Sequence, residues 1–151
     1  MTDNCIEKEI DIAAPVSRVW RALVDHREFG AWFLVNMAGP FVAGELVIGQ
    51  ITHPGYEHVQ MSIRIVQMEP EQLFSFSWLP YAIDPAVDYS GETPTLCEFH
   101  LTPTATGTHL RVTECGFDKV PEWRRELAFR MNSNGWAQQM GNIRKYVEAN
   151  L

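Results

Sequence analysis

One glutamate stands where the strand pattern predicts a buried side chain. In "LRVTECGF", Leu110 and Val112 alternate inward, and a period of two places Glu114 on the same face. A buried carboxylate is costly unless it is hydrogen-bonded or hydrated. Glu114 is therefore predicted to be a polar anchor or a catalytic acid/base in a cavity. The alternative is that the strand ends or bulges at Thr113 and leaves Glu114 in solvent.

Asn132 is the second candidate for chemistry. It lies within about 40° of a helical stripe that contains Trp136, so its side chain is expected to face the sheet. Its alternative role is local capping at a helix bend. With Glu114 as general base, and Asn132 or a nearby tyrosine orienting the substrate, the chain could be a cyclase- or hydrolase-type enzyme.

Other catalytic and metal sites find no support in the motifs. GxSxG, GxGxxG and GxxxxGK[ST] are absent from the sequence, and no cysteine lies in a recognised nucleophile context. His53, Glu57 and His58 cluster in "HPGYEH", but a zinc site would need a second segment, and a surface turn accounts for them better. We expect neither a metal ion nor another cofactor.

The composition of the 151-residue chain predicts one domain, residues 1–151, with a substantial core. Hydrophobic residues make up 46%, too many for a disordered chain, and they are too interrupted to form a membrane span. The formal charge of -7 would repel phosphates, so nucleic acid is not an expected partner.

The three cysteines, Cys5, Cys97 and Cys115, form no CxxC pair. Their odd number fits a reducing cytoplasm, and the polar N-terminus "MTDNCIEKEIDI" does not resemble a secretory signal. We therefore expect a cytoplasmic protein.

Apolar periodicity predicts the elements that would position these residues. Residues 5–14 alternate as a strand, and residues 15–24 and 25–34 follow as two short helices. From residue 41 to residue 117 the period is mostly two, which predicts an antiparallel meander. Within it, the connection "PYAIDPAVDYSGETP", residues 80–94, is either a lid or binding loop, or a solvated hairpin extension.

A long final helix is predicted to start near Pro121. One apolar stripe passes through Trp136, and Trp123, Leu127 and Met131 lie nearly opposite it, so the helix should bend near residues 132–135 or be covered on both sides. Gly135 interrupts this helix, at a cost of about 1 kcal/mol relative to alanine. We assign it to a bend or to flank packing, and expect Gly135→Leu to disturb folding more than helix propensity explains.

Two segments carry a family resemblance. "IDIAAPVSRVWRALVDHREFGAWF" resembles the opening of the START-like (SRPBCC) superfamily, and "NSNGWAQQMGNIRKYVE" resembles its closing "GW" segment. Together they resemble the branch named for the activator of the 90-kDa heat-shock-protein ATPase (AHSA-type). The resemblance implies an α+β helix-grip fold, in which a curved antiparallel sheet of about six to seven strands and two short N-terminal helices enclose a hydrophobic cavity under the C-terminal helix.

The inward-facing aromatic side chains either line that cavity or fill a solid core. The candidate cavity residues are Trp20, Phe33, Met61, Ile63, Phe76, Trp78, Phe99, Val112, Glu114, Asn132 and Trp136.

Three functions follow, in this order. The first is binding of a small hydrophobic or aromatic ligand, lipid-like or polyketide-like, and the second is the Glu114 enzyme described above. The third is a co-chaperone or stress-response interaction domain, which we rank last because the chain is too short for the second domain of the eukaryotic activators. No membrane span is expected.

Overall fold

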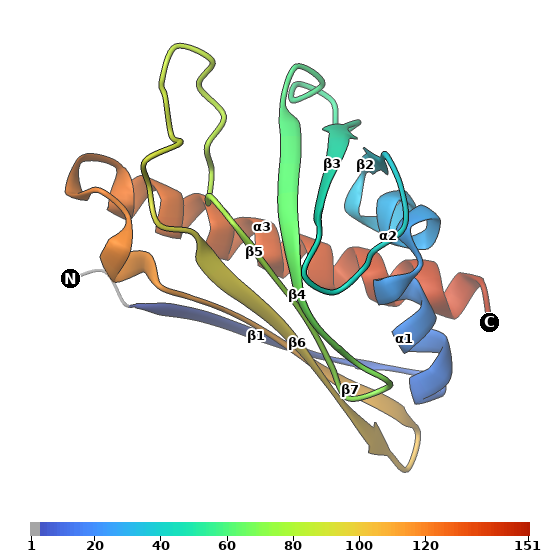
Figure 1. Cartoon of the computed structure of the whole chain (residues 1–151). Helices are drawn as coiled ribbons and strands as arrows, with labels where there is room; N and C mark the ends of the chain where they lie inside the picture. Colours follow the sequence, from blue (N-terminus) through green and yellow to red (C-terminus); the bar gives the residue numbers. More distant parts are fainter. Residues whose placement is uncertain (1–3) are drawn as a thin grey trace.

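A computed structural model of the chain describes residues 4–151. Seven antiparallel strands form one twisted sheet, and a long C-terminal helix lies across one face of it (Figure 1). This is the α+β helix-grip arrangement that the sequence predicts. The elements are β1 (Cys5–Ile12), α1 (Val16–Val24), α2 (His26–Phe33), β2 (Val35–Met37), β3 (Leu46–Ile51), β4 (Gln60–Glu69), β5 (Leu73–Trp78), β6 (Thr95–Thr104), β7 (Gly107–Cys115), the 3-10 turn η1 (Phe117–Lys119) and α3 (Glu122–Ala149).

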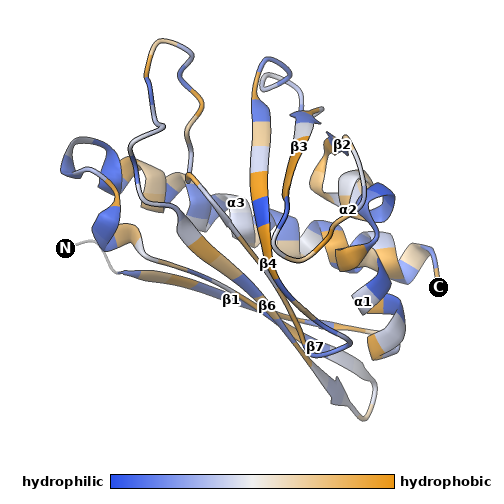
Figure 2. Cartoon of the chain, viewed as in Figure 1, coloured by the Kyte–Doolittle hydropathy of each residue, from blue (hydrophilic) through white to orange (hydrophobic). Residues whose placement is uncertain are grey.

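The strands follow the order β1-β7-β6-β5-β4-β3-β2, so β1 and β2 form the two edges. Their hydropathy alternates because one face packs against the helices, and Figure 2 shows this alternation along β4. On the packed face, Phe74, Phe76 and Phe99 are completely buried. Their rings pack against one another, with centroid distances from 5.9 to 6.2 Å.

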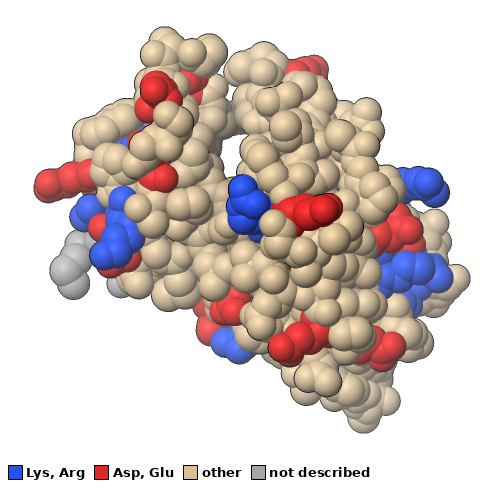
Figure 3. Space-filling view, viewed as in Figure 1, with Lys and Arg blue, Asp and Glu red and all other residues tan. Residues whose placement is uncertain are grey.

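The sheet opens between β4 and the segment that follows β5. The β4–β5 ladder starts at the pair Arg64↔Ser77, so residues 60–63 of β4 pair with β3 alone in the described part of the chain. Residues 79–94, which we call the 79–94 loop, leave the sheet at this point. Figure 3 shows an opening through the molecule here, and most of the atoms around it are uncharged.

Local sequence signals explain the helix pair. Asp25 caps α2, since its carboxylate accepts hydrogen bonds from the backbone N–H groups of Arg27 at 2.9 Å and Glu28 at 3.2 Å. These bonds, led by the one from Glu28, lower the pKa of Asp25. Gly30 is required by close packing, because a Cβ at this position would lie 2.2 Å from the carbonyl oxygen of Val35.

The final helix begins after Pro121, as the sequence predicts, but its first half is not covered on both sides. α3 runs without interruption from Glu122 to Ala149, and the second apolar stripe is left uncovered at its start. Trp123 is 69% exposed and Leu127 is 43% exposed. The expectation that both sides of the first half would be covered is therefore wrong. Among residues 4–151, no helix combines the length and the apolar character that a membrane span requires.

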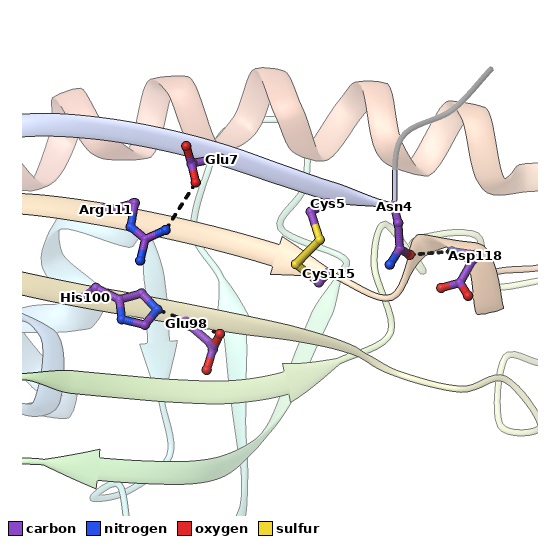
Figure 4. The surroundings of a disulfide bond; sticks show 8 residues. All are labelled: Asn4, Cys5, Glu7, Glu98, His100, Arg111, Cys115 and Asp118. Atoms are coloured by element: carbon purple, nitrogen blue, oxygen red, sulfur yellow. Dashed lines mark hydrogen bonds and ion pairs between the residues drawn. A yellow bond between two sulfur atoms is a disulfide. The ribbon is translucent and has the colours of Figure 1, made fainter.

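A disulfide joins β1 to β7 at one end of their ladder (Figure 4). Cys5 and Cys115 are 110 residues apart in sequence and directly opposite in register. The spacing of the cysteines in the sequence could not reveal this disulfide, because the pairing of β1 with β7 brings the two cysteines together. The inference from an odd cysteine count to a reducing cytoplasm loses its basis, since two of the three cysteines are paired and Cys97 alone remains as a buried thiol.

Candidate ligand cavity

A cavity of about 1010 Å³ lies where the sheet opens, between β4, the 79–94 loop and the middle of α3. Its lining combines aromatic and aliphatic side chains with uncharged polar ones. The charged or titratable lining side chains are His53, Arg64 and Glu92, together with three tyrosines. The three tyrosines are Tyr56, Tyr81 and Tyr89. The remaining lining residues are Phe33, Leu46, Ile51, Val59, Gln60, Met61, Ser62, Ser77, Trp78, Leu79, Ala82, Ile83, Ser90, Pro94, Met131, Asn132, Asn134, Gly135, Trp136, Gln138 and Gln139.

Three aromatic rings from different elements meet in the wall of the cavity. Trp78 ends β5, Trp136 lies in α3, and Phe33 ends α2. The two indole rings are 5.7 Å apart and tilted by 31°, and Phe33 lies 6.2 Å from Trp78 and 6.1 Å from Trp136. Offset and edge-on contacts at these separations are favourable, so the rings form a fixed aromatic surface.

Glu114 lies outside the cavity wall, at the edge of the two indole rings. It belongs to β7 and is completely buried, so the alternative in which it faces solvent is wrong. The indole N–H groups of Trp78 and Trp136 donate to its two oxygens, at 2.8 and 2.9 Å. Thr95 Oγ1 donates at 2.6 Å, and Asn132 Nδ2 donates at 3.0 and 3.2 Å.

This set of neighbours suits a carboxylate rather than a carboxylic acid. An indole N–H can only donate, and one occupies each oxygen of Glu114. The charge affects its surroundings: burial raises the pKa of the Cys97 thiol, and the nearby charge of Glu114 raises it further. Glu114 is therefore a polar anchor that ties β5, β6 and β7 to α3, and its oxygens do not line the cavity.

The predicted cavity residues divide into two groups. Phe33, Met61, Trp78, Asn132 and Trp136 line the cavity. Ile63, Phe76, Phe99, Val112 and Glu114 are buried and Trp20 is half-buried, and none of these six is part of its lining. Both interpretations of the inward aromatic side chains thus apply, because Phe76 and Phe99 are buried in the core while Phe33, Trp78 and Trp136 line the cavity.

Gly135 lines the cavity. A Cβ built at Gly135 meets nothing within 4 Å, and α3 continues through this position. The missing side chain therefore leaves extra volume in the cavity, and no neighbouring backbone packs against Gly135. The expectation that Gly135→Leu would disturb folding loses its physical basis.

The 79–94 loop forms one wall of the cavity and is clamped to α3 by Arg124, which is 5% exposed. Arg124 donates to the Pro80 carbonyl at 2.7 Å and from Nε to both carboxylate oxygens of Glu92, at 3.0 and 3.1 Å. Its guanidinium also lies over the ring of Tyr89, 4.8 Å from the centroid. The loop is thus an anchored wall of the cavity, and its role as a lid or binding loop stays a prediction.

The sequence interpretation missed several of these residues. Thr95 had a usable signal, since it shares a strand face with Cys97 and Phe99 and is completely buried beside Glu114. Arg124 and Tyr81 had none, because loop contacts place them. Burial raises the pKa of Tyr81, and neighbouring Tyr56 raises it further.

His53, Glu57 and His58 are the residues that the sequence analysis considered as zinc ligands and assigned to a surface turn instead. Within residues 4–151, no group of three or more His, Cys, Asp or Glu side chains is arranged to hold a metal ion. His53 lines the cavity, and Glu57 accepts a hydrogen bond from the Gly55 backbone N–H at 2.7 Å.

Solved structures share this architecture. The chain is similar to protein MLL2253 from Mesorhizobium loti, with 26% identity, a TM-score of 0.76 and coverage of 97% of this chain and 98% of that one. It also resembles the Aha1 dimer from Colwellia psychrerythraea, with 15% identity, a TM-score of 0.68 and coverage of 95% and 96%. For DynU16, a putative protein of the dynemicin biosynthetic locus, the identity is 20%, the TM-score 0.73 and the coverage 97% of this chain and 48% of that one.

No curated protein matches the sequence. The sequence model of the family described as "Activator of Hsp90 ATPase homolog 1-like protein" matches residues 13–148, and this range includes the helix pair, the sheet from β2 to β7 and nearly all of α3. The chain therefore belongs to the Activator of Hsp90 ATPase homolog 1-like protein family.

Proposed function

We propose that the protein binds a small hydrophobic or aromatic ligand, lipid-like or polyketide-like, in the cavity beside α3. The observation that carries this proposal is a cavity of about 1010 Å³ whose wall contains the rings of Phe33, Trp78 and Trp136. Ligand sites typically measure about 300–1,000 Å³ and combine apolar walls with a few polar groups. A cavity of this size accommodates a ligand of two or more fused rings.

The polar lining supports binding more than catalysis. Both oxygens of Glu114 accept hydrogen bonds and neither lines the cavity, so this carboxylate is poorly placed to take a proton from a bound substrate. The lining amides, such as Gln60 and Gln138, are suited to orient a ligand.

The test is isothermal titration of the protein with 1-methylnaphthalene, a neutral two-ring probe. The matched variants are Gly135→Leu, which extends a side chain into the cavity, and Gly141→Leu, which adds the same side chain elsewhere on α3 where a Cβ also meets nothing within 4 Å. We expect binding by the unmodified protein and by Gly141→Leu, and a loss of at least tenfold in affinity for Gly135→Leu. Equal affinity in all three proteins would place the probe elsewhere and contradict the proposal.

A co-chaperone role is the second candidate, and the exposed start of α3 is the observation that favours it. Trp123 and Leu127 are exposed one turn apart on the same helical face. Sedimentation with purified Hsp90 would test this role. Complex formation that is lost in a Trp123→Ala/Leu127→Ala variant would support it, and no complex with the unmodified protein would exclude it.

A further inference from the structure

The buried charge of Glu114 has no cationic partner. Its hydrogen-bond donors are Trp78, Thr95, Asn132 and Trp136, all of them neutral, and it takes part in no ion pair among residues 4–151. Neutral donors solvate a carboxylate, but they leave its negative charge in place. The field of Glu114 therefore extends into its surroundings, which include one wall of the cavity.

The two indole rings lie between this charge and the cavity. Each ring gives its N–H to Glu114, and both residues belong to the cavity lining. Trp78 is half-buried, whereas Trp136 is 3% exposed and supports Trp78 from behind at 5.7 Å. The face of an indole ring carries negative electrostatic potential and is the preferred aromatic surface for cations. A hydrogen bond from the ring N–H to a carboxylate polarises the ring further in the same direction.

The other charges at the cavity are either paired or exposed to solvent, which screens them. Glu92 is paired with Arg124, so the two neutralise each other. Arg64 is exposed, and its guanidinium donates to the Gly44 carbonyl at 3.2 Å. His53 is exposed and its Nδ1 lies 3.0 Å from the Pro54 carbonyl oxygen, at the turn between β3 and β4.

We propose that the cavity selects aromatic cations, such as fused-ring ammonium or quinolinium compounds, which would stack on Trp78 near the Glu114 carboxylate. This inference rests on the proposed ligand-binding function and specifies the charge of the ligand. The ring system would gain the apolar contacts of the cavity wall, and its positive charge would gain the attraction of the indole faces and of Glu114. An aromatic anion of the same size would meet repulsion at the same place.

Three probes of one shape separate charge from size: N-methylquinolinium (cation), 1-methylnaphthalene (neutral) and 1-naphthoate (anion). Affinities are measured by isothermal titration in about 0.5 M NaCl, where surface charges are strongly screened and a buried charge is screened much less. For the unmodified protein we expect N-methylquinolinium to bind at least tenfold more tightly than 1-naphthoate. This comparison requires no variant and therefore does not depend on how a substitution folds.

Glu114→Gln then identifies the source of the preference. We expect this variant to bind N-methylquinolinium about tenfold more weakly and 1-methylnaphthalene within twofold of the unmodified protein. The control is Glu98→Gln, which removes a carboxylate on the outer face of the same sheet, where Figure 4 shows Glu98 next to His100. It should leave both affinities unchanged.

The outcomes distinguish the two proposals. If 1-methylnaphthalene binds while the cation binds no more tightly than the anion, the charge selection is wrong and the ligand-binding function stands. A preference for the cation that persists in Glu114→Gln would also overturn the role of Glu114. If no probe binds, the proposed function itself fails.

Discussion

Gly135 and Gly30 both lie inside helices, and the structure predicts opposite results when each is replaced by alanine. At Gly135 the new Cβ would enter the open cavity, with nothing within 4 Å, so the substitution brings only the higher helix propensity of alanine. At Gly30 the new Cβ would lie 2.2 Å from the Val35 carbonyl oxygen, and the backbone at the α2–β2 junction would have to move.

The two magnitudes follow from these contacts. Gly135→Ala should raise the free energy of unfolding by about 1 kcal/mol, which corresponds to a rise in Tm of about 3 °C for a chain of this size. Gly30→Ala should lower the free energy of unfolding by about 1–3 kcal/mol, because the strain of overpacking exceeds the gain in helix propensity.

Urea unfolding followed by circular dichroism measures both changes, and an unchanged m-value would show that the unfolding transition itself is the same. A loss of stability in Gly135→Ala would mean that the space beside this residue is filled. A gain in Gly30→Ala would mean that α2 and β2 are not in close contact. Either result would refute the packing on which the cavity depends.

Glu114→Ala leaves the indole donors of Trp78 and Trp136 without an acceptor, so we expect a loss of about 3 kcal/mol or more in urea unfolding, and a smaller loss would mean that water replaces the carboxylate. Asp25→Ala removes the cap of α2 and should cost about 1 kcal/mol at pH 7. Because the folded state lowers the pKa of Asp25, the stabilisation by its carboxylate is present above the unfolded pKa of about 4 and is lost as the pH falls through the folded pKa. A difference in stability between the unmodified protein and Asp25→Ala that persists at pH 2 would contradict the role of charge. Arg124→Met leaves Glu92 unpaired and should cost about 3 kcal/mol, with faster hydrogen exchange at residues 81–92; unchanged exchange there would show that Arg124 does not hold the loop.

The elements could be predicted because each one has a period. Alternation marks β4 and β7, helical spacing marks α1, and the capping residue Asp25 marks the start of α2. The inward position of Glu114 follows from the same period of two. These signals are local, so a single sequence carries them.

The shape of the cavity could not be predicted because it depends on contacts between distant segments. The β4–β5 ladder stops at Arg64↔Ser77, and nothing in "MSIRIVQ" or "LFSFSW" indicates where pairing ends. The Arg124 clamp and the Cys5–Cys115 pair likewise join segments far apart in sequence. Gly135 shows the consequence, since its sequence signal is the same for a bend, a close contact or an open cavity.

Methionine methyl groups provide the most direct test of ligand binding in the cavity. Met61 and Met131 line it, whereas Met68 and Met140 lie elsewhere in the fold and serve as internal controls. With 13C-methyl-methionine labelling and 1-methylnaphthalene as the probe, we predict intermolecular NOEs to the methyl groups of Met61 and Met131, and none to those of Met68 and Met140. Saturating probe without NOEs to Met61 and Met131 would contradict the account.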